Sequence, residues 1–150
     1  MIENKKEVII REIKCNSEEY RNELKLRDEV LRKPLGMCLY DENMEAEKND
    51  IHIGAYLNNS LVGVLILTKL NSNDLKMRQV AVKGTMQSKK IGSKMVCYAE
   101  DFAKNSGYKN MMLNARKTAV AFYEKQGYKR ISDEFLEINL PHYKMSKCIG

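Results

Sequence analysis

The feature that most constrains this fold is the direct succession of a strand, a polar loop, a helix and a second strand. Residues 75–82 have the apolar, β-branched content of a strand, and after a loop at residues 87–93 apolar side chains recur at helical spacing to about residue 104. Gly107 marks the helix end, and residues 109–113 have the pattern of a strand. A right-handed crossover makes these two strands parallel neighbours.

The loop at residues 87–93, Gln-Ser-Lys-Lys-Ile-Gly-Ser, is a candidate anion site. The first turn of a helix has backbone N–H groups without intrahelical partners, and the aligned peptide dipoles place about half a positive charge there. A pyrophosphate is therefore a suitable ligand. Short loops with Gly and Lys before a helix are common, so the loop by itself does not identify the phosphate that it binds.

The N-terminal part predicts a strand, a helix and a loop. Residues 8–13 form the opening strand, and Asn16 with Glu19 has the spacing of a capping box that begins a helix. The helical pattern ends before Pro34, because a proline disfavours a helical residue ahead of it. Residues 37–50 are polar and acidic, and we expect a loop there with at most a short helical turn.

The remaining segments predict further strands on either side of the opening unit. Residues 51–57 and 61–70 form a hairpin, and a turn at residues 71–74 leads directly into the strand at 75–82. After the parallel strand, residues 117–126 predict a helix that ends at Gly127, followed by strands at residues 128–135 and 142–149. No linker or repeat is present, so we expect residues 1–150 to form one domain.

Composition argues against several classes of protein. Hydrophobic residues make up 43% of the chain and charged residues 31%, as in a soluble globular protein. No apolar run approaches the roughly 20 residues of a membrane span, and the first six residues lack the apolar core of a signal peptide. We therefore expect a cytoplasmic protein without a membrane partner.

The cysteines and the charge distribution argue against a metalloprotein and a nucleic-acid-binding protein. The four cysteines form no C-x-x-C pair and neither histidine lies near a cysteine in sequence, so we expect reduced thiols and no metal. The formal charge of +6 is spread along the chain and not concentrated in one basic block interleaved with aromatic residues. This distribution argues against a nucleic-acid-binding domain.

The element order and the motifs resemble the GNAT acetyltransferase superfamily over nearly the whole chain. The acyl-CoA loop of that family reads Arg/Gln-x-x-Gly-x-Gly/Ala, and residues 87–92 read Gln-x-x-Lys-x-Gly. A later family motif, Ala-x-x-Phe/Leu-Tyr-x-x-x-Gly-Phe/Tyr, is matched in full by residues 119–128. Residues 137–145 are similar to the Glu-x-Gly-Ile-Pro-His-x-x-Met ending of the bacterial ElaA-like and YjcF-like branch.

The resemblance implies an α/β (α+β) fold with a mixed, mostly antiparallel sheet, helices on both faces and a splay between the two central parallel strands. It also implies acetyl-CoA as co-substrate, with loop amides around the pyrophosphate and main-chain groups of the central strand along the pantetheine arm. The expected acetyl-CoA-binding residues are Val80, Ala81, Val82, Gln87, Ser88, Lys89, Lys90, Ile91, Gly92, Ser93, Ala119 and Tyr123. Lys90 replaces the first motif glycine; in a right-handed helical conformation its amide still donates, and its ammonium adds attraction to a phosphate.

Three residues are candidates for acid–base chemistry. Tyr123 lies on an apolar helix face, which is typical of a packing residue, but this GNAT position often protonates the CoA sulfur, so we expect Tyr123 to be the general acid. A lysine-like amine, with a pKa of about 10.4, must lose a proton before it attacks. Glu137, His142 and a water chain near Gln79 are the candidates for that role, and bracing of the last strand is the alternative role of His142.

The function implied by the resemblance is an acetyl-CoA-dependent N-acetyltransferase. A neutral amine attacks the thioester directly, and a backbone N–H near Val80 stabilises the oxyanion. Arg27 and Arg32 lie where the family forms its acceptor-side wall; they are either solvated charges or bidentate partners of an acidic acceptor. The acceptor stays open among small amines, antibiotics, amino acids, peptides and protein lysines. A non-catalytic acyl-CoA-binding or sensing module is the alternative, and a homodimer is plausible for the family.

Overall fold

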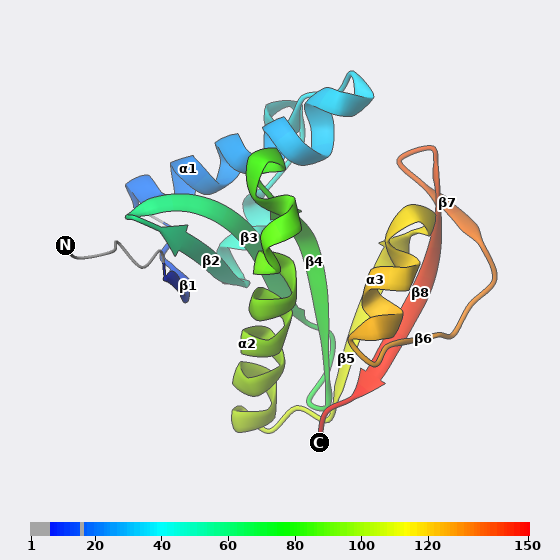
Figure 1. Ribbon diagram of the computed structural model, residues 1–150. Helices are drawn as coiled ribbons and strands as arrows, with labels where there is room; N and C mark the ends of the chain where they lie inside the picture. Colours follow the sequence, from blue (N-terminus) through cyan, green and yellow to red (C-terminus); the bar gives the residue numbers. More distant parts are fainter. Residues whose placement is uncertain (1–6, 16) are drawn as a thin grey trace. The chain divides into compact units, whose positions relative to one another are not determined.

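A computed structural model describes residues 7–15 and 17–150, and the side chains of Ser88 and Lys89 lie outside that description. Its eight strands are hydrogen-bonded in the order β1-β2-β3-β4-β5-β8-β6, and β7 pairs with β8 (Figure 1). β4 and β5 run parallel, whereas the β1–β2, β5–β8, β6–β8 and β7–β8 pairs are antiparallel. The predicted mixed, mostly antiparallel sheet is therefore confirmed.

The chain folds as two compact units. The first contains Met1–Ile66 and Gln79–Met95, and the second contains Leu67–Arg78 and Val96–Gly150. Three elements, β3 (Ser60–Lys69), β4 (Asp74–Val82) and α2 (Ile91–Asn105), contribute residues to both. The expectation of a single domain over residues 1–150 stays a prediction.

The strands of the first unit follow the predicted order. β1 (Val8–Ile13) pairs with β2 (Ile51–Leu57), and Ile10 lies opposite Ala55. β2 and β3 are joined at Asn58 and Asn59, whose φ values of 52° and 65° suit a two-residue hairpin turn. Asparagine tolerates this left-handed conformation better than other side chains, which is why the sequence signals the turn.

The helical segment of the first unit begins and ends differently from the prediction. α1 (Glu18–Arg27) is capped by the Ser17 hydroxyl, which accepts a hydrogen bond from the Tyr20 amide at 3.4 Å. The predicted cap, Asn16, lies outside the described residues. After Arg27 the chain continues as a π-helical turn at Asp28–Arg32 and a 3-10 turn at Lys33–Leu35. The α-helix thus ends before Pro34, but helical turns include it, because a proline in a first turn loses no hydrogen bond. Two short 3-10 turns, at Leu39–Asp41 and Glu45–Asn49, lie where the sequence predicted a loop with at most one.

Helices cover both faces of the strands in the first unit. Leu26 of α1 packs in a buried cluster with Ile13, Val64 of β3 and Ala81 of β4. The preceding β3 residue, Gly63, faces the other way: a Cβ there would lie 2.9 Å from the sulfur of Met95 in α2. Successive residues of a strand point to opposite faces, so α1 and α2 lie on opposite sides of β3.

The second unit is built around β5 (Asn110–Arg116). Four of its residues pair in parallel with β4, from Asp74 opposite Asn110 to Met77 opposite Leu113. β8 (Leu140–Cys148) pairs with β5 along its length, and the two strands lie side by side in Figure 1. A 3-10 turn at Lys117–Ala119 leads into α3 (Val120–Lys125), which packs against β5 and ends before Gly127, where φ is 97°.

The strand predicted at residues 128–135 is wrong. The structure has a two-residue strand, β6 (Lys129–Arg130), then an irregular segment and a separate strand, β7 (Phe135–Glu137). The interruption lies at Ser132, whose hydroxyl accepts a hydrogen bond from the Lys144 amide at 2.9 Å and so replaces a backbone partner in the ladder. β7 and β8 form a hairpin whose turn residues, Ile138 and Asn139, have φ values of 48° and 60°.

One face of β5 is buried and the other is partly open. Met111, Leu113 and Ala115 are buried, whereas the alternating residues between them are half-buried. Polar side chains on the open face can therefore meet a ligand without disturbing the core. In the described part of the chain, no helix has the length and apolar content to cross a membrane.

Candidate functional site

The loop predicted to bind a pyrophosphate is tied to the end of β4. It forms a 3-10 turn at Gly84–Lys89, and α2 begins at Ile91. The Gln87 side chain donates a hydrogen bond to the Val82 carbonyl at 3.0 Å, and the Lys83 amide donates to the Val62 carbonyl at 2.8 Å. Gln87 thus holds the loop against the strand, and the Val82 carbonyl, expected to face a pantetheine arm, already accepts this hydrogen bond.

Lys90 has a left-handed backbone conformation, with φ of 60° and ψ of 20°. The right-handed conformation considered for it from the sequence is therefore wrong. Glycine is favoured in the left-handed region because it has no Cβ, so the structure explains in backbone terms the glycine of the family motif. The Lys90 side chain is exposed.

The start of α2 has the charge expected of an anion site. Its first turn contains no acidic residue, so no carboxylate within that turn offsets the positive end of the helix dipole. The Lys94 amide donates to the Lys90 carbonyl at 3.2 Å and begins the hydrogen-bond ladder. Ile91 is buried, so Gly92 and Ser93 are the residues of this turn that reach the surface in part.

The central strand is irregular just before the residues predicted to contact the cofactor. Gln79 has φ of 54° within β4, which interrupts the extended backbone directly ahead of Val80. The Ala81 side chain is buried in the core, whereas Val80 and Val82 are half-buried. The cofactor role assigned to Ala81 is thus confined to its backbone.

Tyr123 is buried in α3 and keeps its proton over a wide pH range. Its side chain is 7% exposed, and burial raises its pKa to about 12. Its ring meets Phe122 and Tyr128 edge to face, with centroid distances of 5.0 and 5.8 Å. Ala119, the first residue of the same motif, precedes the first turn of α3 and is half-buried.

Glu137 and His142 meet across the β7–β8 hairpin. The Glu137 carboxylate lies 3.4 Å from His142 Nε2, and the Leu140 carbonyl lies 2.8 Å from Nδ1. A carbonyl only accepts, so Nδ1 carries a proton, and a neutral ring then points its Nε2 lone pair at the carboxylate. The gap between Nε2 and Glu137 is consequently a position for one further proton.

The sequence alone did not identify Asn114 as part of this group. Its side-chain nitrogen donates to Glu137 at 3.1 Å, while its side-chain oxygen is buried without a hydrogen-bond partner. Asn114 lies on β5 directly opposite Lys144 of β8. A polar residue within a strand carries no motif of its own, so only the pairing of β5 with β8 could have revealed it.

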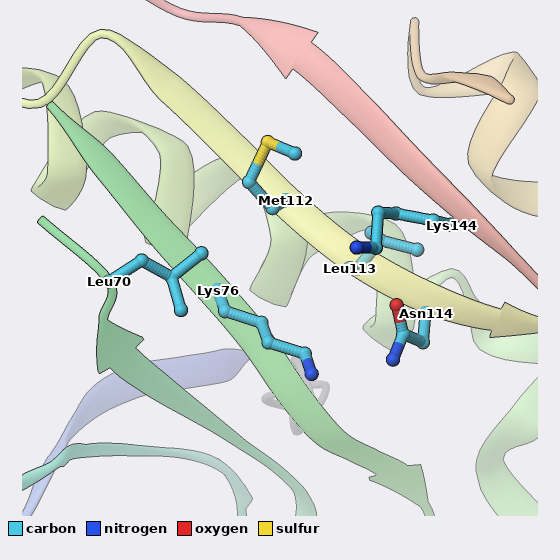
Figure 2. A pocket seen from close by; sticks show the side chains of 6 residues that line it. All are labelled: Leu70, Lys76, Met112, Leu113, Asn114 and Lys144. Carbon is cyan, nitrogen blue, oxygen red and sulfur yellow. The ribbon is translucent and has the colours of Figure 1, made fainter. Parts of the chain in front are cut away.

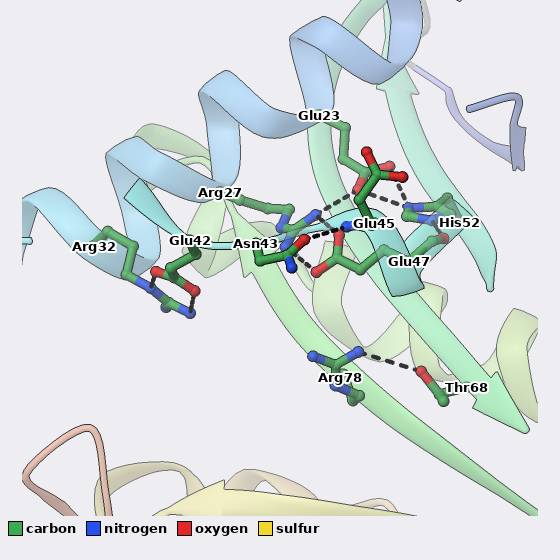
Figure 3. A network of polar contacts seen from close by, with 10 residues as sticks. All are labelled: Glu23, Arg27, Arg32, Glu42, Asn43, Glu45, Glu47, His52, Thr68 and Arg78. Carbon is green, nitrogen blue, oxygen red and sulfur yellow. Dashed lines mark hydrogen bonds and ion pairs between the residues drawn. The ribbon is translucent and has the colours of Figure 1, made fainter. Parts of the chain in front are cut away.

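Arg27 and Arg32 are not solvated, contrary to the first of the two sequence interpretations. Arg27 is 1% exposed; one nitrogen donates to Glu23 at 3.0 Å, and the guanidinium makes two bonds of 2.8 and 2.9 Å to Glu47 (Figure 3). Arg32 is 6% exposed and pairs with Glu42 at 2.6 and 3.2 Å. Both guanidinium groups are thus engaged by carboxylates of the same chain.

His52 completes the buried group around Arg27. Its Nδ1 lies 2.8 Å from Glu23, and its Nε2 lies 2.8 Å from the Glu47 carbonyl (Figure 3). Burial alone lowers the pKa of His52, but the hydrogen bonds and charges of Glu23 and Glu47 together outweigh it, so the pKa is raised above its ordinary value. A protonated His52 and Arg27 then balance Glu23 and Glu47, two cations against two carboxylates.

Comparisons with known proteins agree with this arrangement. The model of the acetyltransferase (GNAT) domain matches residues 14–149. The uncharacterized N-acetyltransferase YjcF of Bacillus subtilis is 29% identical over 133 residues, which cover 88% of this chain and 94% of that protein. The crystal structure of Escherichia coli ElaA has a TM-score of 0.81 at 18% identity and covers 94% of this chain and 99% of that one.

A second similar structure contains a cofactor. It is an aminoglycoside 6'-N-acetyltransferase complexed with coenzyme A, with a TM-score of 0.74, 21% identity and coverage of 94% of this chain and 97% of that one. At these identities the structures establish the shared fold, and the domain model, which spans most of the sequence, establishes the family. The chain belongs to the acetyltransferase (GNAT) domain family.

Proposed function

We propose that this protein is an acetyl-CoA-dependent N-acetyltransferase that moves the acetyl group to the amine of an acceptor by direct attack. The observation that carries the proposal is the proton position between Glu137 and His142 Nε2, in a chain of the acetyltransferase (GNAT) family. An ammonium ion does not attack a thioester, so such a transferase needs a group that accepts one proton. This hairpin provides one.

The reaction balances with the residues of the chain. The Glu137–His142 pair takes one proton from the ammonium and releases it to solvent, and the neutral amine then attacks the thioester carbon and gives a second proton to the pair. A backbone N–H near Val80 stabilises the oxyanion. The carbon–sulfur bond then breaks, the sulfur takes the Tyr123 proton, and solvent returns the proton held by the pair to the phenolate. The products are the N-acetylated acceptor and free CoA, and no metal takes part.

The high pKa of Tyr123 defines its role. A thiol such as that of CoA has a pKa of about 8.5, so full proton transfer from a phenol with a pKa of about 12 is uphill by about 5 kcal/mol. Tyr123 therefore acts first as a hydrogen-bond donor that stabilises the thiolate while it forms. The acid form that this role needs is present throughout the neutral and mildly alkaline range.

The loop around Gln87 and the first turn of α2 are proposed to hold the CoA pyrophosphate. Supporting this role are the absence of acidic residues from the first turn of α2 and the Gln87 bond to the Val82 carbonyl, which holds the loop in place. The backbone amides of residues 88–93 are the proposed donors. The acceptor wall is not assigned to Arg27 and Arg32, because each guanidinium group is already engaged by a carboxylate of the same chain.

A thiol-release assay with acetyl-CoA and a panel of amines tests the proposal. We expect Tyr123→Phe to lower kcat by about 100-fold or more while acetyl-CoA binding, measured by calorimetric titration, is unchanged. Tyr128→Phe is the matched control: its hydroxyl donates to Glu100 at 2.8 Å, so the variant loses stability but keeps its turnover per folded molecule.

Two results would count against the proposal. Normal turnover of Tyr123→Phe removes this residue from the mechanism. Binding of acetyl-CoA without thiol release, with every amine in the panel, indicates instead a non-catalytic acyl-CoA-binding module.

A further inference from the structure

The open face of the second unit contains a small pocket of about 130 Å³ (Figure 2). Lys76 of β4, Asn114 of β5 and Lys144 of β8 supply its polar groups, and Leu70, Met112 and Leu113 supply apolar surface. Lys76 lies opposite Met112, and Asn114 opposite Lys144. Residues paired in this way share a face, so three neighbouring strands direct their side chains to one place.

The charges around this pocket are not balanced. The half-buried Lys76 ammonium lies within electrostatic reach of a second lysine, Lys144, and of the Glu137 carboxylate. Among the described residues neither the Lys76 nor the Lys144 ammonium forms an ion pair or a hydrogen bond. Two lysine ammonium groups without such a partner, near one carboxylate, favour an anionic ligand.

Asn114 adds a second requirement. Its nitrogen is committed to Glu137, which fixes the orientation of the amide, so the unpartnered buried oxygen needs a ligand that donates a hydrogen bond. A ligand that satisfies the pocket therefore combines an anionic group with an N–H or O–H group a short distance away.

Resting on the proposed function, we infer that the acceptor is a small amine that also carries a carboxylate, held with its carboxylate at Lys76 and Lys144 and its amine at the Asn114 oxygen. Asn114 contacts Glu137 through its other side-chain atom, so the bound amine lies beside the group that takes its proton. A pocket of about 130 Å³ suits a molecule of a few carbon atoms, since drug-sized ligands need roughly 300–1,000 Å³.

Pairs of acceptors that differ only in charge test this inference. Glycine, β-alanine and 4-aminobutyrate are each compared with the corresponding carboxamide in the thiol-release assay. We expect the best carboxylate to exceed its amide at least tenfold in kcat/KM. Lys76→Met and Lys144→Met should remove most of this preference by lowering kcat/KM for the carboxylate, while circular dichroism spectra that match the parent protein show that the variants are folded. Lys104→Met, at an exposed lysine of α2 outside the pocket, should keep the preference.

Binding is measured separately, by calorimetric titration of the same amino acids in the absence of acetyl-CoA. Binding that weakens at least tenfold in Lys76→Met but not in Lys104→Met supports the inference. Thiol release with other amines, without measurable binding of any amino carboxylate, overturns the inference and leaves the proposed function intact. Absence of thiol release with every amine overturns the proposed function itself, and lysine-dependent binding of an amino carboxylate that is never acetylated overturns its assignment as the acceptor.

Discussion

Two groups of charged side chains in this protein are arranged in opposite ways. In the first unit, Glu23, Arg27, Glu47 and His52 are buried together, and each charge is engaged by another member. In the second unit, Lys76 and Lys144 line an open pocket without an ion-pair partner among the described residues. The balanced buried group stabilises one arrangement of the chain, because each of its charges would be unfavourable in the interior without a partner. The lysines of the open pocket have no such partner, so they can attract an anionic ligand.

The largest effect is expected from breaking the balanced group. Arg27→Met leaves Glu23 and Glu47 with less compensation in a buried site, and we expect a loss of about 3–5 kcal/mol in the free energy of unfolding, measured with urea. Arg32→Met is the control, because its partner Glu42 is 38% exposed and can turn to water. Equal losses in the two variants would show that burial of the carboxylate partners does not distinguish these arginines.

A smaller effect is expected at the exposed acid of the second unit. Glu137→Gln removes the carboxylate of the proton position, and we expect kcat to fall by about 100-fold with little change in stability, since the side chain is 46% exposed. Glu134→Gln is a matched control, with a carboxylate 43% exposed that pairs with Lys117. A loss of activity as large in Glu134→Gln would indicate a general charge effect.

The balanced group should also respond to pH. The pKa of His52 is raised in the folded protein, so its contribution to stability is complete below about pH 6.5, the ordinary value, and is lost as the pH rises through the folded value. We expect the free energy of unfolding to fall over this range, and His52→Gln to remove that part of the slope. A stability that rises with pH in the same window, and loses this rise in His52→Gln, would contradict the ion pair with Glu23.

The smallest effect concerns Lys90, an exposed charge at the candidate anion site. Lys90→Ala removes the ammonium and keeps the Cβ, so we expect CoA affinity to fall about two- to fivefold at low salt and less at high salt. In Lys90→Gly, relief of left-handed strain and the greater freedom of the unfolded chain oppose each other, so stability should change by less than about 1 kcal/mol. A loss of affinity that is independent of salt would argue against contact of the ammonium with a phosphate.

Local signals explain which parts of the fold the sequence predicted. Asn58 and Asn59 predict a hairpin turn, and Gly107 and Gly127 predict helix ends, because each position needs a backbone conformation that few residues adopt. The motif of residues 119–128 likewise located Tyr123 on a helix. Such signals depend on neighbours in sequence, so they can be read without knowledge of the fold.

The errors arose where distant residues decide the outcome. The sequence favours solvated charges as one interpretation of Arg27 and Arg32, because their partners, Glu47 and Glu42, lie in a loop without a pattern. The break after β6 depends on a hydrogen bond from the Lys144 amide to Ser132. Asn114 became a candidate only through its pairing with Lys144 and its bond to Glu137. Tertiary contacts of this kind leave no trace in a single sequence.

The β7–β8 hairpin keeps Glu137 and His142 together when the hairpin moves. Glu137 and His142 are joined by a two-residue turn, and Glu137 lies opposite Leu140, whose carbonyl holds the His142 ring. The carboxylate, the ring and the carbonyl thus all belong to one short hairpin. Insertion of one residue into the turn would change the strand register and separate them, whereas displacement of the hairpin as a whole would carry the assembled group along.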